Sequence, residues 1–197
     1  VLSSAHNLSN ELEIFNKLYK SKEIRKLYYY LQETLPDQKE EINSSYFFKS
    51  KESKEIKIHQ DNAYFNFVSG IDCLTFYIPV HYQSKTKGTI FYFSGSHSLG
   101  DLDHETKGNL GASMCLKTNS ALKNFNIEYL TLNPGDMVLH NGLVVHGTLG
   151  NKRSLLCEAF NFTLFGENNK QDYSKLNNYK KMLEESLRSN SQLIKDL

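Results

Sequence analysis

The sequence has no tryptophan, three prolines and three cysteines among its 197 residues, and it has no long hydrophobic run. A bilayer-spanning helix needs roughly 20 consecutive apolar residues, so a transmembrane segment is excluded. The cysteines (Cys73, Cys115 and Cys157) are odd in number, far apart and set in apolar runs. This pattern favours buried free thiols in a reducing compartment, and we expect a cytoplasmic protein. The start "VLSSAHNLSN" lacks the basic region and apolar core of a signal peptide. The sequence does not begin with Met, which is compatible with the removal of an upstream segment.

An excess of charge of either sign is also lacking. Lys plus Arg is 23 and Asp plus Glu is 22, which leaves a net charge of +1. Such a balance offers no electrostatic attraction to a polyanion or an anionic membrane, so we expect neither nucleic acid nor membrane as a partner. The expected partner is a small-molecule substrate, and the oligomeric state is not readable.

The chain has the length of one domain, and we expect a single domain over residues 1–197. Apolar residues recur at helical spacing over 8–35, where Ser21 can cap a second helix, and again over about 173–187. Between about 46 and 165 the pattern changes to short runs separated by turn residues. The expected strands are Tyr46–Lys49, Glu55–Asp61, Asp72–Val80, Thr89–Ser94, Ala112–Leu116, Ile127–Leu132, Met137–Leu139, Leu143–Thr148 and Ser154–Phe165. Short strands without intervening helices predict a mainly β, antiparallel sandwich or jelly roll with helices packed outside.

Three side chains form a candidate metal site. His59 and Asp61 lie two residues apart on a predicted strand in "KIHQDNAYF", so both side chains are expected on one face. One imidazole and one carboxylate are two thirds of the facial triad of non-haem Fe(II) oxygenases, and His146 in "GLVVHG" supplies a third ligand. Alternatively, His146 is a hydrogen-bonded core histidine. His140 competes for the same role, although its place before the turn "NG" favours a strand-end residue.

Two further residues suit an organic acid beside the metal. Arg153 follows His146 across the turn "LGNK", where its guanidinium could hold a dicarboxylic cosubstrate with two hydrogen bonds. Thr148 is two residues past His146 and could add a hydroxyl bond. The alternative for Arg153 is a surface arginine on a turn. The segment "DLDHE" also offers metal-binding groups, but a solvated loop is the favoured reading.

The chain resembles the phytanoyl-CoA dioxygenase family of Fe(II)- and 2-oxoglutarate-dependent oxygenases. The similarity lies in the ordered series "HQD", "TFYIPVHYQSKTKGTIFYFSGSH", "LNPGD", "VLHNGLVVHGT" and Arg153, over residues 55 to 160. It implies a double-stranded β-helix (cupin-like jelly roll), with His59, Asp61 and His146 as iron ligands. It also implies 2-oxoglutarate binding by Arg153 and Thr148, although the stretch between His146 and Arg153 is shorter than is common in the family.

The implied activity is hydroxylation of an unactivated C–H bond, with Fe(II) as the metal and 2-oxoglutarate and O2 as cosubstrates. No catalytic residue is assigned beyond the metal ligands. The carboxylate of Asp61 disfavours halogenation, since halogenating members leave this position without a ligand. Tyr64, Phe65 and Tyr77 could line an apolar substrate pocket, or they could pack the core. The alternatives are desaturation, epimerisation or cyclisation at the same iron site, or a non-catalytic jelly roll that binds a structural metal.

Overall fold

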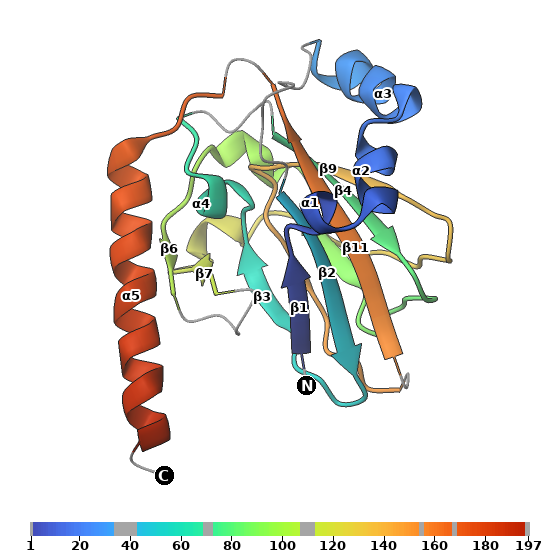
Figure 1. Ribbon diagram of the computed structural model, residues 1–197. Coiled ribbons are helices and arrows are strands. Elements are labelled where there is room, and N and C mark those ends of the chain that lie inside the picture. Colours follow the sequence, from blue (N-terminus) through green and yellow to red (C-terminus); the bar gives the residue numbers. More distant parts are fainter. Residues whose placement is uncertain are drawn as a thin grey trace.

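The computed structural model describes residues 2–33, 43–68, 73–106, 113–153, 156–166 and 169–195 (Figure 1). Its strands are β1 (Leu2–His6), β2 (Asn43–Ser50), β3 (Ile56–His59), β4 (Cys73–Pro79), β5 (Ile90–Phe93), β6 (His104–Glu105), β7 (Cys115–Leu116), β8 (Ile127–Tyr129), β9 (Val138–Asn141), β10 (His146–Thr148) and β11 (Leu156–Phe165). Its α-helices are α1 (Leu8–Glu11), α2 (Glu13–Tyr19), α3 (Lys22–Gln32), α4 (Asn62–Phe65) and α5 (Tyr173–Lys195). Short 3-10 helices cover Ser96–Leu99 and Ser120–Leu122.

The strands form two main antiparallel sheets that face each other as a jelly roll, which confirms the predicted fold class. The larger sheet has the order β1-β2-β11-β4-β9 and the smaller sheet has the order β3-β10-β5-β8, while β6 and β7 pair separately. Strands distant in sequence are therefore neighbours in space. In particular, β10 lies between β3 and β5 and pairs His146 with His59.

The larger sheet buries both faces, and residue type alternates between them along each strand, as the pleat requires. On β11, Phe160, Phe162 and Leu164 pack with Tyr28 of α3 in the main hydrophobic core. The intervening residues of β11 (Cys157, Ala159, Asn161, Thr163 and Phe165) face the inside of the roll and line a cavity. The outer face thus carries the apolar core, and the inner face carries a mixture of polar and apolar groups.

The N-terminal helices cover the outer face of the larger sheet, in blue in Figure 1. The prediction of two helices is corrected to three, because extended backbone at Leu12 separates α1 from α2. The predicted cap of the next helix is confirmed, since the Ile24 amide of α3 donates to the Ser21 hydroxyl at 3.3 Å.

The C-terminal helix α5 stands on the opposite side of the molecule, next to α4 and the β6–β7 pair (Figure 1). It starts at the predicted Tyr173 and extends to Lys195, beyond the predicted end at 187. An ion pair of 2.5 Å between Lys175 and Asp101 and a ring contact between Tyr179 and Tyr64 hold α5 against the body.

Several strand assignments differ from the prediction. The short strand β6 was not predicted, and the strands expected over Ile127–Leu132 and Leu143–Thr148 are shortened to β8 and β10. The edge strand β1, which pairs with β2, was not predicted. The strand expected over Ala112–Leu116 is reduced to β7 (Cys115–Leu116), and Ala112 itself lies outside the described residues. The strand expected over Glu55–Asp61 ends at His59, so Asp61 is not a strand residue. Among the helices of the described segments, none combines the length and apolar character needed to cross a membrane.

Candidate metal centre and its cavity

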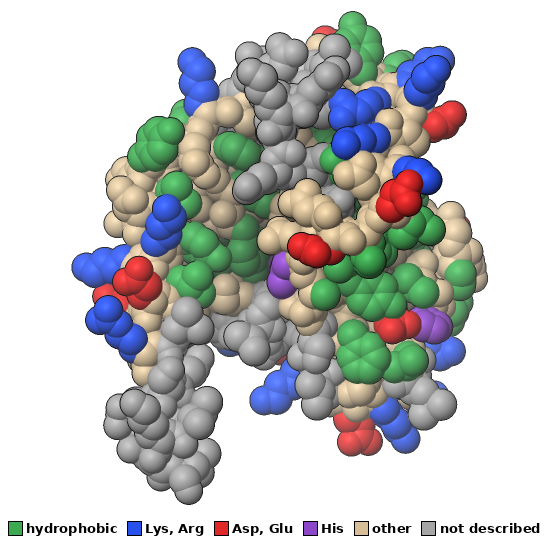
Figure 2. Space-filling view, in the orientation of Figure 1, with side chains coloured by type: hydrophobic (Ala, Val, Ile, Leu, Met, Phe, Trp, Pro, Cys, Tyr) green, Lys and Arg blue, Asp and Glu red, His purple; other side chains and the backbone are tan. Residues whose placement is uncertain are grey.

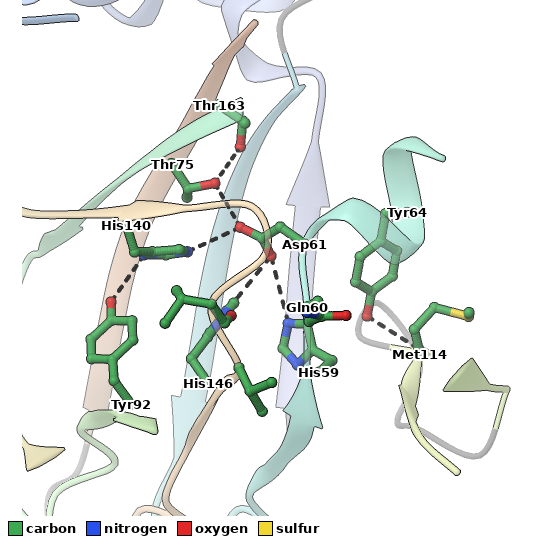
Figure 3. A network of polar contacts seen from close by, with 12 residues as sticks. His59, Gln60, Asp61, Tyr64, Thr75, Tyr92, Met114, His140, His146 and Thr163 are labelled. Carbon is green, nitrogen blue, oxygen red and sulfur yellow. Dashed lines mark hydrogen bonds and ion pairs between the residues drawn. The ribbon is translucent and has the colours of Figure 1, made fainter. Parts of the chain in front are cut away.

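The side chains of His59, Asp61 and His146 converge inside the roll (Figure 3). Oδ1 of Asp61 lies 3.7 Å from Nε2 of His59 and 3.6 Å from Nε2 of His146. An ion bound at about 2.0–2.2 Å from each donor requires any two donors to lie within about 4.4 Å of each other. Both distances meet this limit, and the donor atoms of all three residues lie within 4.8 Å of one another, so the group is close enough together to share one divalent ion. Among the described residues, this is the one group of three His, Cys, Asp or Glu side chains close enough to share an ion.

The two histidines present a lone pair at Nε2. Nδ1 of His59 lies 2.8 Å from the carbonyl oxygen of Lys57, and Nδ1 of His146 lies 3.1 Å from that of Val144. A carbonyl oxygen only accepts, so each Nδ1 carries the proton of a neutral imidazole. The protein thereby sets the tautomer that leaves Nε2 free to coordinate a metal.

Asp61 is held through its other carboxylate oxygen. Oδ2 accepts a hydrogen bond of 2.6 Å from the Thr75 hydroxyl and one of 3.0 Å from Nε2 of His140. Thr163 donates in turn to Thr75 at 2.9 Å, and Tyr92 donates to Nδ1 of His140 at 3.0 Å (Figure 3). These bonds leave Oδ1 directed at the two histidines, as a monodentate ligand requires.

The protonation states suit a metal ligand set. Burial lowers the pKa of His146 well below its usual range, helped by repulsion from His59 and His140, and burial likewise lowers the pKa of His59. For Asp61, burial acts to raise the pKa, but attraction from His146 and the hydrogen bond from His140 outweigh it and lower the pKa. The result is two neutral imidazoles beside one carboxylate.

The backbone brings the three residues together differently from the sequence argument. His59 and His146 are paired across β3 and β10, as neighbouring strands were expected to place them. Asp61 has helical dihedral angles (φ −63°, ψ −32°) at the start of α4, so the turn out of β3 directs its carboxylate inward. His59 and Asp61 therefore lie close together as predicted, but not because they share a strand face. The turn at Asp61 brings its carboxylate to His59.

The sequence predicts His140 as a strand-end residue, with the role of a competing ligand as the alternative. His140 does lie next to the end of β9, and its side chain is buried, with 7% exposure. It forms a hydrogen bond with Asp61 and is not one of the three proposed metal ligands. Thr75 pairs with His140 across β4 and β9, and the sequence did not predict a role for it. A histidine and a threonine inside short strands give no sequence signal for this supporting role.

The metal centre opens into a cavity of about 840 Å³ within the roll. All three residues proposed from sequence for the substrate side (Tyr64, Phe65 and Tyr77) line it. Phe65 packs against Phe67 and Phe165, with ring centroids 5.9 and 4.9 Å away. Tyr77 is buried and donates to Oε1 of Gln83 at 2.9 Å, and the Tyr64 hydroxyl accepts from the Met114 amide at 3.1 Å.

A buried lysine lies at one end of this cavity. Lys49 of β2 is 3% exposed, and its Nζ donates to the Thr148 hydroxyl at 2.5 Å and to the Leu149 carbonyl at 2.7 Å. Burial lowers the pKa of Lys49 to about 8, although Cys157 and Glu55 act in the opposite direction. Sequence reasoning missed Lys49. Lys49 is one of three lysines in the segment "YFFKSKESKE", where each looks like a solvated charge.

The structure does not bring Arg153 to the metal centre. Its side chain is exposed on the turn that follows β10, and it does not line the cavity, whereas Thr148 is buried and does. The shorter stretch between His146 and Arg153 explains this placement, because the chain has not yet entered β11 when it reaches Arg153. In the structure, Arg153 is therefore a surface arginine on a turn, which was the alternative to a cosubstrate-binding role.

The segment "DLDHE" has a structural role in the described residues. Nε2 of His104 accepts from the Gln60 amide at 3.0 Å, and Asp101 bonds Asn62 and Lys175. These contacts fix the loop that carries Gln60 between the two proposed ligands His59 and Asp61.

Comparisons with known proteins agree with this geometry. Residues 13–154 match the family model described as phytanoyl-CoA dioxygenase (PhyH). The chain matches none of the curated proteins.

Several solved structures share the fold. The non-heme alpha-ketoglutarate-dependent epimerase SnoN from nogalamycin biosynthesis superposes with a TM-score of 0.68 at 17% identity, covering 84% of this chain and 63% of that one. EctD from S. alaskensis, solved with 2-oxoglutarate and 5-hydroxyectoine, superposes with a TM-score of 0.67 at 14% sequence identity. The match covers 86% of this chain and 58% of EctD. EvdO2 from Micromonospora carbonacea var. aurantiaca, complexed with 2-oxoglutarate, superposes with a TM-score of 0.68 at 15% sequence identity. The match covers 87% of this chain and 70% of EvdO2. The chain thus spans 63% and 58% of the lengths of SnoN and EctD.

Proposed function

The chain belongs to the phytanoyl-CoA dioxygenase family, and we propose that it is an Fe(II)- and 2-oxoglutarate-dependent dioxygenase that hydroxylates a small molecule. The observation that supports this most directly is the convergence of His59 Nε2, Asp61 Oδ1 and His146 Nε2 inside a cavity. Three donors on one side of an ion leave the opposite side open for cosubstrate and oxygen, as in the facial triads of non-haem iron oxygenases.

The iron with its cosubstrates supplies the oxidation: 2-oxoglutarate, O2 and a C–H compound give succinate, CO2 and the hydroxylated product. The protein residues hold the reactants in place and exclude water. The carbonyl oxygens of Lys57 and Val144 keep the two histidines in the coordinating tautomer. Thr75 and His140 hold Asp61 ionised and oriented.

In this proposal Lys49 and Thr148 hold the distal carboxylate of 2-oxoglutarate. Thr148 follows His146 by two residues on β10, which places it about 6.6 Å farther along the strand, a separation that a five-carbon diacid can span. The Lys49 ammonium is bonded to two neutral oxygens, and a buried cation is stabilised by an anion beside it. Arg153, which the family resemblance suggested for this role, points to solvent in the present structure.

The substrate would occupy the cavity on the side of α4 and α5. Tyr64 and Phe65 of α4 form part of this wall, and Tyr179 of α5 contacts the Tyr64 ring at 6.4 Å between centroids. Tyr77, deeper on β4, would border both substrate and cosubstrate. These three proposed contacts, Tyr64, Phe65 and Tyr77, supply mostly apolar surface.

Desaturation, epimerisation and cyclisation at the same iron site are the alternative reactions, and SnoN is an epimerase with a similar fold. They differ from hydroxylation in the fate of the substrate radical, which the ligand set does not decide. A non-catalytic metal-binding module is the remaining alternative.

We also propose a cytoplasmic location. Cys73, Cys115 and Cys157 are all free and buried, as thiols in a reducing compartment are.

The test is an anaerobic titration of the purified protein with Fe(II) and then 2-oxoglutarate, followed through the visible metal-to-ligand charge-transfer band. We expect the band with the wild type and its loss in His59→Ala. A folded wild type that binds iron but gives no band with 2-oxoglutarate would favour the non-catalytic module. Succinate release with a panel of small molecules then identifies the reaction.

The same titration tests the cosubstrate residues. Lys49→Met should weaken 2-oxoglutarate binding by about 10- to 100-fold, since hydrogen bonds to charged groups are the stronger class. Arg153→Met is the matched control and should bind normally. 2-Oxopentanoate, which has the same chain without the distal carboxylate, should bind equally to wild type and Lys49→Met. The reverse pattern, with loss only in Arg153→Met, would return the role to Arg153.

A further inference from the structure

The cavity has few charges left for a substrate. Among its described lining residues, Asp61 and Lys49 are the ones whose side chains carry a full charge. In the proposed function, Asp61 binds the metal and Lys49 binds the cosubstrate. A charged substrate would then bring a charge into a buried site without an opposite charge to pair with, which is strongly unfavourable.

Two polar atoms in the same cavity lack partners. Oδ1 of Asn161 and Oδ1 of Asn169 are buried and accept no hydrogen bond, and both residues line the cavity. Nδ2 of Asn169 donates to the Gly166 carbonyl at 3.2 Å, so this bond fixes which end of the amide is the oxygen. Buried acceptors are nearly always satisfied in native proteins, so each oxygen calls for a donor from a bound molecule.

Asn161 is placed close to the metal donors. It lies on the inner face of β11, two residues from Thr163, whose hydroxyl bonds Thr75 and through it Asp61. A group that donates to Asn161 is therefore held near the reacting centre. Asn169 follows the end of β11 in the chain and lines the same cavity.

Three aromatic rings form part of the wall of the same cavity. Phe65, Phe67 and Phe165 pack edge to face or stacked, with centroids 4.9 to 5.9 Å apart, and all three line the cavity. Figure 2 shows hydrophobic side chains gathered on this side of the molecule, between α5 and the strands. The cavity thus combines an apolar wall with two uncharged acceptors.

We propose that the substrate is an uncharged, partly apolar molecule that donates hydrogen bonds from hydroxyl or N–H groups to Asn161 and Asn169. This inference rests on the proposed function, because that function commits Asp61 and Lys49 to other ligands. It excludes free acids, amines and phosphate esters as substrates. Asn161 is the specificity residue nearest the reacting carbon, and Asn169 recognises a second donor.

The experiment uses four probes built on one ring: cyclohexanediol, its dimethyl ether, cyclohexanecarboxylate and cyclohexylamine. Binding is measured by saturation-transfer NMR at millimolar concentration on the zinc-loaded protein with 2-oxoglutarate, and by the change each probe makes in the charge-transfer band of the anaerobic iron complex. We expect the diol to bind at least about 10-fold more tightly than the other three, because each of them lacks a donor or adds a charge. Stronger binding of the acid or the amine, or equal binding of the dimethyl ether, would overturn the proposal.

Variants of the two asparagines locate the contacts. Asn161→Leu and Asn169→Leu should each weaken diol binding by about 5- to 10-fold without changing the melting temperature much. Asn161→Asp keeps the shape but adds a negative charge, so it should bind cyclohexylamine better than wild type does. Unchanged diol binding in both leucine variants would overturn the assignment. Absence of the charge-transfer band would refute the proposed function. The NMR comparison of the probes does not depend on that band, so it tests the two asparagines separately.

Discussion

Nε2 of His140 lies 3.0 Å from Oδ2 of Asp61, whereas Oδ1 of the same carboxylate faces Nε2 of His59 and Nε2 of His146. One carboxylate oxygen is therefore engaged by the protein, and the other remains for a metal. Tyr92 completes the arrangement by donating to the second nitrogen of His140 at 3.0 Å. His140 orients the proposed ligand without belonging to the ligand set.

Removal of this contact should weaken metal binding. We expect His140→Leu to lower Fe(II) affinity by about 10- to 100-fold, the usual cost of losing a residue that orients a metal ligand. His140→Gln keeps a donor of similar reach and should recover part of the affinity. Competition with a metal-binding dye under anaerobic conditions measures both, and equal affinity of His140→Leu and wild type would show that Thr75 alone suffices.

Gly147 separates His146 from Thr148 on β10 and has no room for a side chain. A Cβ atom there would lie 2.9 Å from the Ile56 carbonyl oxygen and 2.9 Å from Cζ of Phe91. We expect Gly147→Ala to lower the free energy of unfolding by about 1–3 kcal/mol and to displace His146, with weaker Fe(II) binding.

Gly135→Ala is a suitable control for Gly147→Ala. Gly135 has a φ of +95° with open space around it and lies outside the cavity lining, so alanine should cost about 1–3 kcal/mol through backbone strain alone. Thermal unfolding should show losses in both variants, while Fe(II) affinity should fall only in Gly147→Ala. Normal Fe(II) affinity in Gly147→Ala would contradict the steric argument.

The pH dependence of 2-oxoglutarate binding should follow Lys49, whose pKa burial lowers to about 8. The ammonium is charged below this value and loses its charge as the pH rises through it. Affinity should therefore be highest below about pH 8 and fall by up to about tenfold per pH unit above it. Of the groups that face Lys49, Cys157 and Glu55 both act to raise its pKa, and burial raises the pKa of the Cys157 thiol.

The charge-transfer titration repeated across pH measures this dependence. Lys49→Met should show flat affinity through the same window, and so should wild type with 2-oxopentanoate. A fall of equal size in Lys49→Met would assign the pH dependence to another group.

The cap of α3 offers a test of stability separate from the site. Ser21→Ala removes the hydroxyl that accepts from the Ile24 amide at 3.3 Å, and it should cost about 1 kcal/mol, or about 2–4 °C in melting temperature. Ser21→Asp restores an acceptor and should recover most of this loss. Fe(II) affinity should not change in either variant, because α3 packs on the outer face of the larger sheet.

Much of the fold was predictable from local pattern. Short alternating runs indicated the strands. Successive side chains of a strand point to opposite faces of the sheet, so residue type alternates with a period of two where the two faces have different surroundings. The cap at Ser21 and the start of α5 at Tyr173 were also predictable from local signals. The edge strand β1 was not, since its five residues acquire a strand conformation through pairing with β2.

The site was predictable in its chemistry and less so in its geometry. The types and order of His59, Asp61 and His146 pointed to a facial triad, and the structure brings their donor atoms together. The spacing to Arg153 suggested an acid-binding residue that the structure leaves exposed. His140 and Lys49, which support the carboxylate and line the cavity, carried no distinguishing local signal.

The amino-acid sequence by itself determined which residue types could perform the chemistry and, within a strand, which side chains share a face. Alternation along β2 groups Ser45, Phe47 and Lys49 together whatever the fold. Only the tertiary structure decided that this face lies inside the roll, that Lys49 meets Thr148 there, and that the turn after β3 aims Asp61 at two histidines. The physical reason is that local periodicity specifies relative orientation within one element, whereas burial and proximity arise from pairing between strands far apart in the chain.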